Sequence, residues 1–188
     1  KMMRQISYAE AGMEALLEEM ERDPKTFHLS TNAPVPLVEK FGHSRVRGTP
    51  IAEGALTGMA IGAAGSGFRP IIDWRMVTFS FVAMDQIVNQ ASKIHYMFGG
   101  QTKFPILYRA TVGGGVRMAA QHSQSPYSMF MNLAGLKMIL PSTPYDTKGL
   151  LKTAIRDNNP VISFESTRLL TMQGPVPEED YTIPLGVA

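Results

Sequence analysis

The sequence predicts an α/β fold, namely a three-layer sandwich around a mostly parallel sheet. Apolar segments of strand length alternate with helical segments, and the connections between them are short. The inner strands are apolar at consecutive positions, as is typical of strands that are buried on both faces. We therefore expect helices on both sides of a single sheet.

Composition narrows the class of protein. The 188 residues are 44% hydrophobic and 18% charged, which suits one globular domain with a sizeable core. The net charge of +2 gives no reason to expect a nucleic-acid or membrane-surface partner, and neither a membrane span nor a signal peptide is expected. Cysteine is absent, which excludes disulfides and suits a reducing compartment, so we expect the cytoplasm.

The first expected element is an amphipathic helix from Ser7 to Glu21. Ser7 followed by Glu10 is a capping box, which satisfies backbone N–H groups at the start of a helix. Asp23-Pro24 ends the helix. Its predicted buried stripe consists of Ala11, Ala15, Leu16 and Met20.

Short elements follow this helix. We expect a strand at 26–29, a loop at 30–36, a helical turn at 37–41 closed by Gly42, and a strand at 45–47.

The next stretch, from Gly48 to Gly65, is the segment on which the functional prediction rests. Thr49-Pro50 ends an extended segment, because a residue before proline favours extended geometry. Small residues then recur at helical spacing, although each glycine costs a helix about 1 kcal/mol relative to alanine. A helix that keeps these glycines is expected to approach another element closely, in this chain or in a partner subunit.

Glu53 is the one carboxylate at the mouth of that helix. Beside an apolar wall its pKa would rise, and it would exchange protons near neutral pH. The alternative is a first-turn acid that is stabilised by the helix dipole. Both interpretations place Glu53 at the first turn.

The second half of the chain continues the alternation. The expected elements are a strand at 69–74, a helix at 81–96, a strand at 105–109, a glycine-rich loop at 111–124, a strand at 137–140, a helix at 145–157 and a strand at 160–165. The tail from Val176 to Ala188 shows neither the helical nor the strand periodicity of apolar residues, and we expect it to be a linker.

Three candidates for function fall at the carboxyl ends of the strands, where parallel sheets place ligands. They are Glu53, the segment from Asp73 to Phe79, and His122 in the glycine-rich loop. A carboxylate, an aromatic face and an imidazole suit a flat, protonatable heterocycle. The alternatives are core packing for Phe79 and Phe81 and a surface-loop histidine for His122, while His28, His43 and His95 are expected to be structural or solvated.

Several common motifs are missing from the sequence. Its glycine clusters, 65–67 and 113–115, do not stand between a strand and a helix as a dinucleotide fingerprint requires. The chain also has no Walker A sequence and no GxSxG motif.

A series of ordered motifs carries a family resemblance. These are TPIAEGALTGMAIGAAGSGFRPI, FSFVAMDQIVNQASKIHYMFGGQ, AAQHSQS, GLKMILPSTPYDTKGLLKTAIRDNNPV and VPEEDYTIPLG. From about Phe41 to its end the chain closely resembles the beta subunit of thiamine-diphosphate-dependent 2-oxo acid dehydrogenases of the pyruvate, branched-chain and acetoin types. The resemblance implies a transketolase-like pyrimidine-binding domain at 1–175, and a linker at 176–188 toward a C-terminal domain.

The resemblance also implies roles for single residues. Glu53 matches the family carboxylate that hydrogen-bonds N1′ of the aminopyrimidine and promotes activation of the cofactor. Phe79 matches the aromatic ring that stacks on the pyrimidine, and Ile51 a wall of the same pocket. His122 matches the histidine that faces the substrate and assists acyl transfer to the lipoyl group.

Cofactors and partners follow from the same resemblance. The family binds the diphosphate and magnesium through an alpha subunit, so this chain is expected to hold half of a thiamine diphosphate site. The implied assembly is a heterotetramer of two alpha and two beta subunits, with self-association of the beta subunits and a lipoyl acyltransferase as further partner. A structural potassium site is implied at Ile106, Ala154, Ile155, Asp157 and Asn159.

The chain departs from the family pattern near the expected site. It reads Leu29-Ser30-Thr31-Asn32 where the family has Leu-Gly-Glu-Asp-Val and a longer loop, so an acidic residue is lost. Gly48 stands where aspartate is common, and Val82 replaces a frequent glutamine. Trp74-Arg75 replaces smaller or uncharged residues beside the pyrimidine pocket.

Arg75 therefore has two open interpretations. It can pair with a substrate carboxylate or phosphate, or with Glu53, in which case it would lower the pKa of Glu53. We expect a 2-oxo acid dehydrogenase subunit. The alternatives are a transketolase-like or acetoin-cleaving thiamine enzyme subunit, and a non-catalytic beta-type assembly module.

Overall fold

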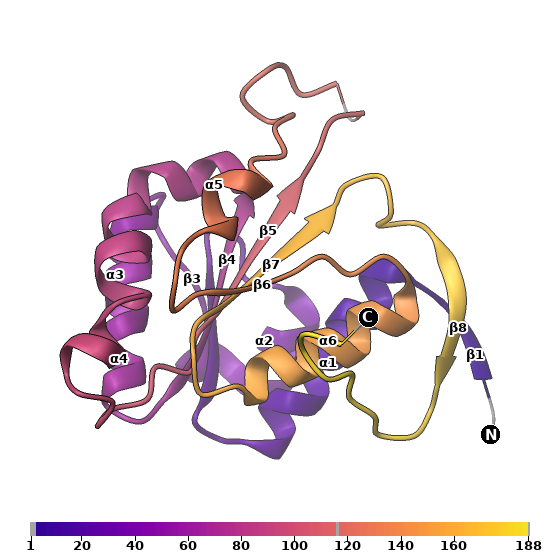
Figure 1. Ribbon diagram of the computed structural model, residues 1–188. Coiled ribbons are helices and arrows are strands. Elements are labelled where there is room, and N and C mark those ends of the chain that lie inside the picture. Colours follow the sequence, from indigo (N-terminus) through magenta and orange to yellow (C-terminus); the bar gives the residue numbers. More distant parts are fainter. Residues whose placement is uncertain (1–2, 116, 188) are drawn as a thin grey trace.

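Figure 1 shows the computed structural model, which describes residues 3–115 and 117–187. The expected three-layer α/β sandwich is confirmed. Its central sheet has six parallel strands in the order β3-β2-β4-β5-β7-β6. The strands are β2 (Thr26–Ser30), β3 (Val46–Gly48), β4 (Arg69–Met76), β5 (Leu107–Val112), β6 (Lys137–Ile139) and β7 (Val161–Ser166).

Helices cover both faces of this sheet (Figure 1). One face packs against α1 (Tyr8–Arg22), α2 (Val35–Arg45) and α6 (Pro144–Arg156). The other face packs against α3 (Glu53–Gly65), the 3-10 helix η1 (Val77–Ala83), the π-helix η2 (Gln86–Ala91) and α5 (Tyr127–Met131), with α4 (Ile94–Met97) following η2. Two apolar cores result, one on each side of the strands. In the described residues no helix is long and apolar enough to cross a membrane.

Helices with strong local signals form as predicted. Ser7 caps α1, and its hydroxyl and the Glu10 carboxylate make the reciprocal bonds of a capping box. All four residues of the predicted stripe are buried. Gly42 breaks α2 with a φ of 68°, close to the predicted end of the helical turn.

The single helix predicted at 81–96 is wrong. The segment is divided into η1, η2 and α4. Its start is a run of β-branched and aromatic residues, which are poor helix formers. In η2 the N–H of Ser92 donates to the carbonyl of Ile87 at 3.1 Å, a bond five residues apart. Despite the break, Ile87 and Ala91 stay buried, as the apolar pattern indicates.

The glycines of α3 allow the close approach that the sequence predicts, and the neighbour is in this chain. A Cβ atom added to Gly54 would lie 3.2 Å from the carbonyl oxygen of Val82 in η1. The backbones of α3 and η1 are therefore almost in contact. This contact holds the mouth of α3 against the segment that carries Phe79.

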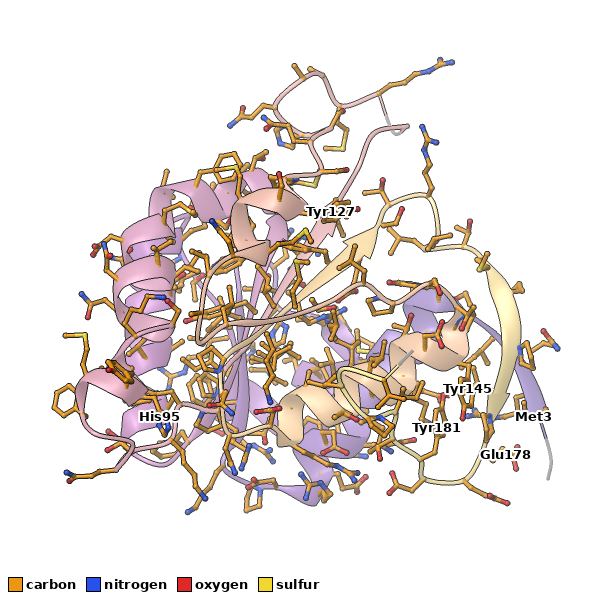
Figure 2. The ribbon with its side chains drawn as sticks, in the orientation of Figure 1. Met3, His95, Tyr127, Tyr145, Glu178 and Tyr181 are labelled. Atoms are coloured by element: carbon orange, nitrogen blue, oxygen red, sulfur yellow. The ribbon has the colours of Figure 1, made fainter. Side chains whose placement is uncertain are left out.

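The two ends of the chain form a small sheet that was not predicted. Strand β1 (Met3–Ser7) pairs antiparallel with β8 (Gln173–Pro177), and Figure 2 places Met3 near Glu178. Residues beyond β8 then lie along α6. Tyr181 stacks on Tyr145 with ring centroids 4.6 Å apart, and the hydroxyl of Thr153 donates to the carbonyl of Ile183 at 2.7 Å (Figure 2).

A network of charges joins α1, α6 and this tail. Lys148 and Lys152 are fully buried, and their ammonium groups pair with Glu14, Glu18 and Asp180. Buried charges are tolerated only when they are paired. The network therefore ties the tail to the body of the domain.

The packing of the tail gives a testable prediction. A Cβ atom at Gly149 would lie 2.6 Å from Ile183 and 2.9 Å from Tyr181. Gly149→Ala should therefore displace the tail and lower the free energy of unfolding by about 1–3 kcal/mol, measured by denaturant titration with amide exchange at 181–185. Gly62→Ala is the control, because its Cβ would meet open space on a helix and should stabilise the protein by about 0.5–1 kcal/mol. Unchanged stability and exchange in Gly149→Ala would contradict the packing.

Candidate functional site at the carboxyl edge of the sheet

Glu53 is the first residue of α3 and is only 6% exposed. Its carboxylate makes no hydrogen bond or ion pair with another residue among those the structure describes. A buried carboxylate without a partner is costly, and buried charges in proteins are normally paired or bound to a ligand. The positive end of the helix dipole offsets only part of that cost. The arrangement leaves Glu53 available to a group from outside this chain.

A buried chain of hydrogen bonds fixes the backbone at Glu53. The hydroxyl of Thr57 donates to the carbonyl of Glu53 at 2.7 Å, and Nε1 of Trp74 donates to the same hydroxyl at 3.0 Å. Trp74 is 1% exposed and stacks on Tyr108 with ring centroids 4.7 Å apart. Trp74 therefore belongs to the core and supports the first turn of α3 from the sheet.

Thr57 is a residue that the sequence reasoning missed. A threonine four residues after the start of a helix commonly bonds back to the helix carbonyl. That spacing is visible in the sequence. What could not be seen is Trp74, which joins this threonine to the neighbouring strand.

The structure brings Phe79 and His122 together. Phe79 lies in η1 and His122 in the loop 113–126, and their rings meet edge to face with centroids 5.3 Å apart. Both side chains are half-buried. Phe81, by contrast, packs against the apolar core. Ile51 precedes α3 and is 82% exposed, so it borders the mouth of this helix without packing into the protein.

Arg75 lies at an irregularity of β4, near the same edge of the sheet. Its side chain is exposed and lines a cleft of about 530 Å³ together with Asp73 and Arg109. The cleft also borders α1, through Ala9 and Met13. Among the described residues the structure shows no ion pair between Arg75 and Glu53. The structure therefore does not form the pair with Glu53 that was one of the two interpretations of Arg75.

A buried polar layer lies on the α1 side of the sheet. Arg109 donates to Glu165 from Nε and Nη2 at 2.7 and 2.6 Å. His28 and Ser30 are fully buried on β2, and their polar side-chain atoms make no hydrogen bond within the part of the chain that the structure describes. Burial, and then the charges of Arg109 and Arg75, lower the pKa of His28 to about 3. His28 is thus neutral in the folded protein, and its structural interpretation holds.

The residues of the implied potassium site lie together around the end of α6. Their carbonyl groups are already in use: Nη1 of Arg69 donates to the carbonyls of Ile155 and Asp157, both at 3.0 Å. The Asp157 carboxylate accepts from Lys137 at 2.5 Å and from the Asn159 backbone at 2.8 Å. Main-chain oxygens suit a hard cation. An ion here would share two of its oxygens with the guanidinium of Arg69. In the described residues no group of three acidic, histidine or cysteine side chains is placed to hold a metal.

Known sequences and structures were compared with this chain. Residues 4–173 match the family described as transketolase, pyrimidine binding domain. The 2-oxoisovalerate dehydrogenase subunit beta of Bacillus subtilis (strain 168) is 44% identical over 196 residues, which cover 99% of this chain and 60% of that protein. The pyruvate dehydrogenase E1 component subunit beta of Rickettsia felis is 43% identical, over 98% of this chain and 59% of that protein.

A third relative is an acetoin enzyme. The acetoin:2,6-dichlorophenolindophenol oxidoreductase subunit beta of Bacillus subtilis (strain 168) is 51% identical over 152 residues, covering 81% of this chain and 44% of that protein. This chain therefore spans 60% or less of the length of these three relatives. Among solved structures, a split gene transketolase described as an inactive beta4 tetramer has the same fold, with a TM-score of 0.74 at 22% identity over 95% of this chain and 57% of that chain.

The buried histidine predicts a pH dependence of stability. Because the pKa of His28 is lowered to about 3 in the folded protein, unfolding below pH 6.5 takes up a proton. This residue should therefore cost up to about 1.4 kcal/mol of stability per pH unit as the pH falls toward 3. His28→Leu should remove that dependence and, because it removes two unpartnered nitrogens, stabilise the protein at neutral pH.

Denaturant titration between pH 7 and 4 measures the effect. His43→Gln is the matched control, because the side chain of His43 is exposed. Parallel pH profiles for the wild type and His28→Leu would contradict the prediction.

Proposed function

The chain belongs to the family of transketolase pyrimidine-binding domains, and on that premise we propose that it is part of the beta subunit of a thiamine-diphosphate-dependent 2-oxo acid dehydrogenase. In this proposal it holds the aminopyrimidine half of the cofactor. The observation that carries the proposal is Glu53, a buried carboxylate with no partner among the described residues. Two of the relatives named above are beta subunits of 2-oxo acid dehydrogenases.

The residues present fit an aminopyrimidine. The Glu53 carboxylate would accept a hydrogen bond from a protonated ring nitrogen, which would supply the partner that it lacks. The half-buried ring of Phe79 offers a face for stacking, and Ile51 would close the pocket as an apolar wall. When bound, thiamine diphosphate supplies the carbon nucleophile and the electron sink for decarboxylation.

Glu53 and His122 would have different tasks. Glu53 would hold and release the proton at the pyrimidine nitrogen, with its backbone kept in place by Thr57 and Trp74. His122 would act as acid or base during acyl transfer to a lipoyl group. Its ring is oriented by its contact with Phe79, so both side chains would face the same ligand.

The proposal requires a second chain. The diphosphate and magnesium would be held by an alpha subunit, in a heterotetramer that includes a beta dimer and delivers its acyl group to a lipoyl acyltransferase. Residues 1–175 would form the pyrimidine-binding domain and 176–188 the linker toward a C-terminal domain, in a cytoplasmic enzyme. The second chain is supported by the names of the relatives, which are subunits designated beta, and the C-terminal domain by their greater length.

An acetoin-cleaving enzyme is the second candidate. It is favoured by the 51% identity to the acetoin oxidoreductase subunit. Acetoin is a neutral ketol, whereas 2-oxo acids carry a carboxylate. The two candidates therefore differ in the charge of the substrate.

The protein that carries this chain should bind thiamine diphosphate and magnesium tightly only when it is mixed with its alpha subunit, as measured by calorimetry. Glu53→Gln should lower turnover by about 10²–10⁴-fold, because the proton-exchanging carboxylate is lost. His122→Asn should also lower turnover but leave the cofactor affinity within about twofold. A complex that assembles but binds no cofactor would contradict the enzyme and support an assembly module.

We also propose a structural potassium ion at Ile106, Ala154, Ile155, Asp157 and Asn159. Each carbonyl oxygen has two lone pairs, so those of Ile155 and Asp157 can serve both Arg69 and an ion. Potassium at ten times its dissociation constant should stabilise the protein by about 1.4 kcal/mol relative to choline at equal ionic strength, or roughly 3–6 °C in Tm. Arg69→Gln removes the competing cation and should enlarge this difference. The same Tm in both salts, for both proteins, would contradict the site.

A further inference from the structure

The cleft beside Arg75 is a second feature of the carboxyl edge. It has a volume of about 530 Å³, within the range of small-molecule sites. The polar residues that line it are Asn32, Asp73, Arg75, Arg109, Thr111, Glu165 and Thr167. They come from the ends of β4, β5 and β7 and from the segments that follow β2 and β7. The cleft therefore sits where parallel sheets bind ligands.

The backbone of Arg75 is held in a conformation that residues other than glycine rarely adopt. Its φ is 69°, in the left-handed region that favours glycine. Two side chains fix this backbone: Asp73 accepts from the Arg75 N–H at 2.7 Å, and Thr111 donates to the Arg75 carbonyl at 2.6 Å. Strained residues of this kind persist where the surroundings over-determine them, and they concentrate at functional sites.

A β-bulge interrupts β4 at Trp74 and Arg75. Asp73 pairs with Arg109 and Met76 with Thr111, so two residues of β4 lie opposite one residue of β5. A bulge of this kind re-aims side chains and is common beside active sites. Trp74 keeps its place in the core on the α3 side, and Arg75 lines the cleft on the α1 side.

The guanidinium of Arg75 is available for a ligand. Both carboxylates of the cleft have partners within the chain: Glu165 is bound by Arg109, and Asp73 accepts from the backbone of Arg75. The Arg75 side chain itself makes no hydrogen bond or ion pair with a described residue. An arginine fork with free donors is suited to a carboxylate.

The cleft and the proposed cofactor site share one loop. Met118 lines the cleft, and His122, four residues later, contacts Phe79. Arg75 and Phe79 are also four residues apart, so their Cα atoms lie within about 14 Å of each other. The shared loop and the short stretch of chain between Arg75 and Phe79 place the cleft and the Phe79–His122 pair at the same edge of the sheet.

We infer that Arg75 is a specificity-determining residue that binds the carboxylate of a 2-oxo acid and disfavours neutral ketols. The inference rests on the proposed function and deepens it, because it chooses between the two candidate substrates. The same chemistry would suit the diphosphate of the cofactor, and the experiment separates these two sources of negative charge.

The test uses the protein reconstituted with its alpha subunit, thiamine diphosphate and magnesium. Reduction of dichlorophenolindophenol reports turnover of pyruvate, a branched-chain 2-oxo acid and acetoin. Arg75→Gln should lower kcat/KM for the 2-oxo acids by about 10- to 100-fold, the value of a charge-assisted hydrogen bond, chiefly through KM. Turnover of acetoin should stay within about threefold or rise, and Arg75→Lys should recover part of the loss.

Two controls separate the possible outcomes. Arg47→Gln removes another exposed arginine at this edge, one that does not line the cleft. It should leave kcat/KM unchanged for both the 2-oxo acids and acetoin. The affinity for thiamine diphosphate should be unchanged in Arg75→Gln. If only this affinity fell, Arg75 would be assigned to the diphosphate and the inference would be overturned. Equal effects on 2-oxo acid and acetoin, or no effect on either, would overturn the inference while leaving the enzyme established.

A second measurement does not depend on turnover. Trp74 is the only tryptophan of the chain and is next to Arg75. The fluorescence of Trp74 can be isolated in the complex by using an alpha subunit without tryptophan, or by placing an indole analogue in this chain. This fluorescence should respond to pyruvate in the wild type and not in Arg75→Gln. An equal response in both proteins would overturn the inference, even if no substrate is turned over and the proposed function fails.

Discussion

The buried carboxylate of Glu53 is the constraint on which the site depends. The structure supports the backbone at Glu53 rather than its carboxylate. Thr57 and Trp74 tie the first turn of α3 to the sheet, and Gly54 lets the same turn approach η1. The scaffold is thus rigid around a group whose own hydrogen-bonding capacity is left open. That combination is typical of ligand sites, where the protein bears the cost of desolvation before the ligand arrives.

The two faces of the sheet serve different purposes at its carboxyl edge. On the α3 side the last residues of the strands are apolar, and they support Phe79 and the mouth of α3. On the α1 side the same strands carry the pair Arg109–Glu165 and the cleft. Because side chains alternate along a strand, neighbouring residues such as Trp74 and Arg75 contribute to opposite sides. In β4, one residue can therefore pack in the core while the next residue faces a ligand.

Features with local signals could be predicted from the sequence, and features that depend on distant partners could not. The capping box at Ser7 and the stripe of α1 are local, and both are present. The helix expected at 81–96 is divided; its start consists of poor helix formers, and Val82 there lies against Gly54 of α3. For the site, the position of Glu53 at a turn was visible in the sequence. The bond from Trp74 to Thr57 and the bulge at Arg75 were not, because the first depends on how α3 packs against β4 and the second on the register of β4 and β5.

The pairing of β1 with β8 has a consequence for biosynthesis. Glu14, Glu18 and Glu19 pair with Lys148, Lys152 and Arg156, besides the nearer Arg4 and Arg22. Helix α1 therefore leaves the ribosome long before some of the groups that neutralise it. Contacts between such distant segments slow folding, because a long loop must close first. The first helix of the chain is therefore among the last to dock. Until then the α1 face of the sheet is uncovered, and that is the stage at which a chaperone would have most to protect.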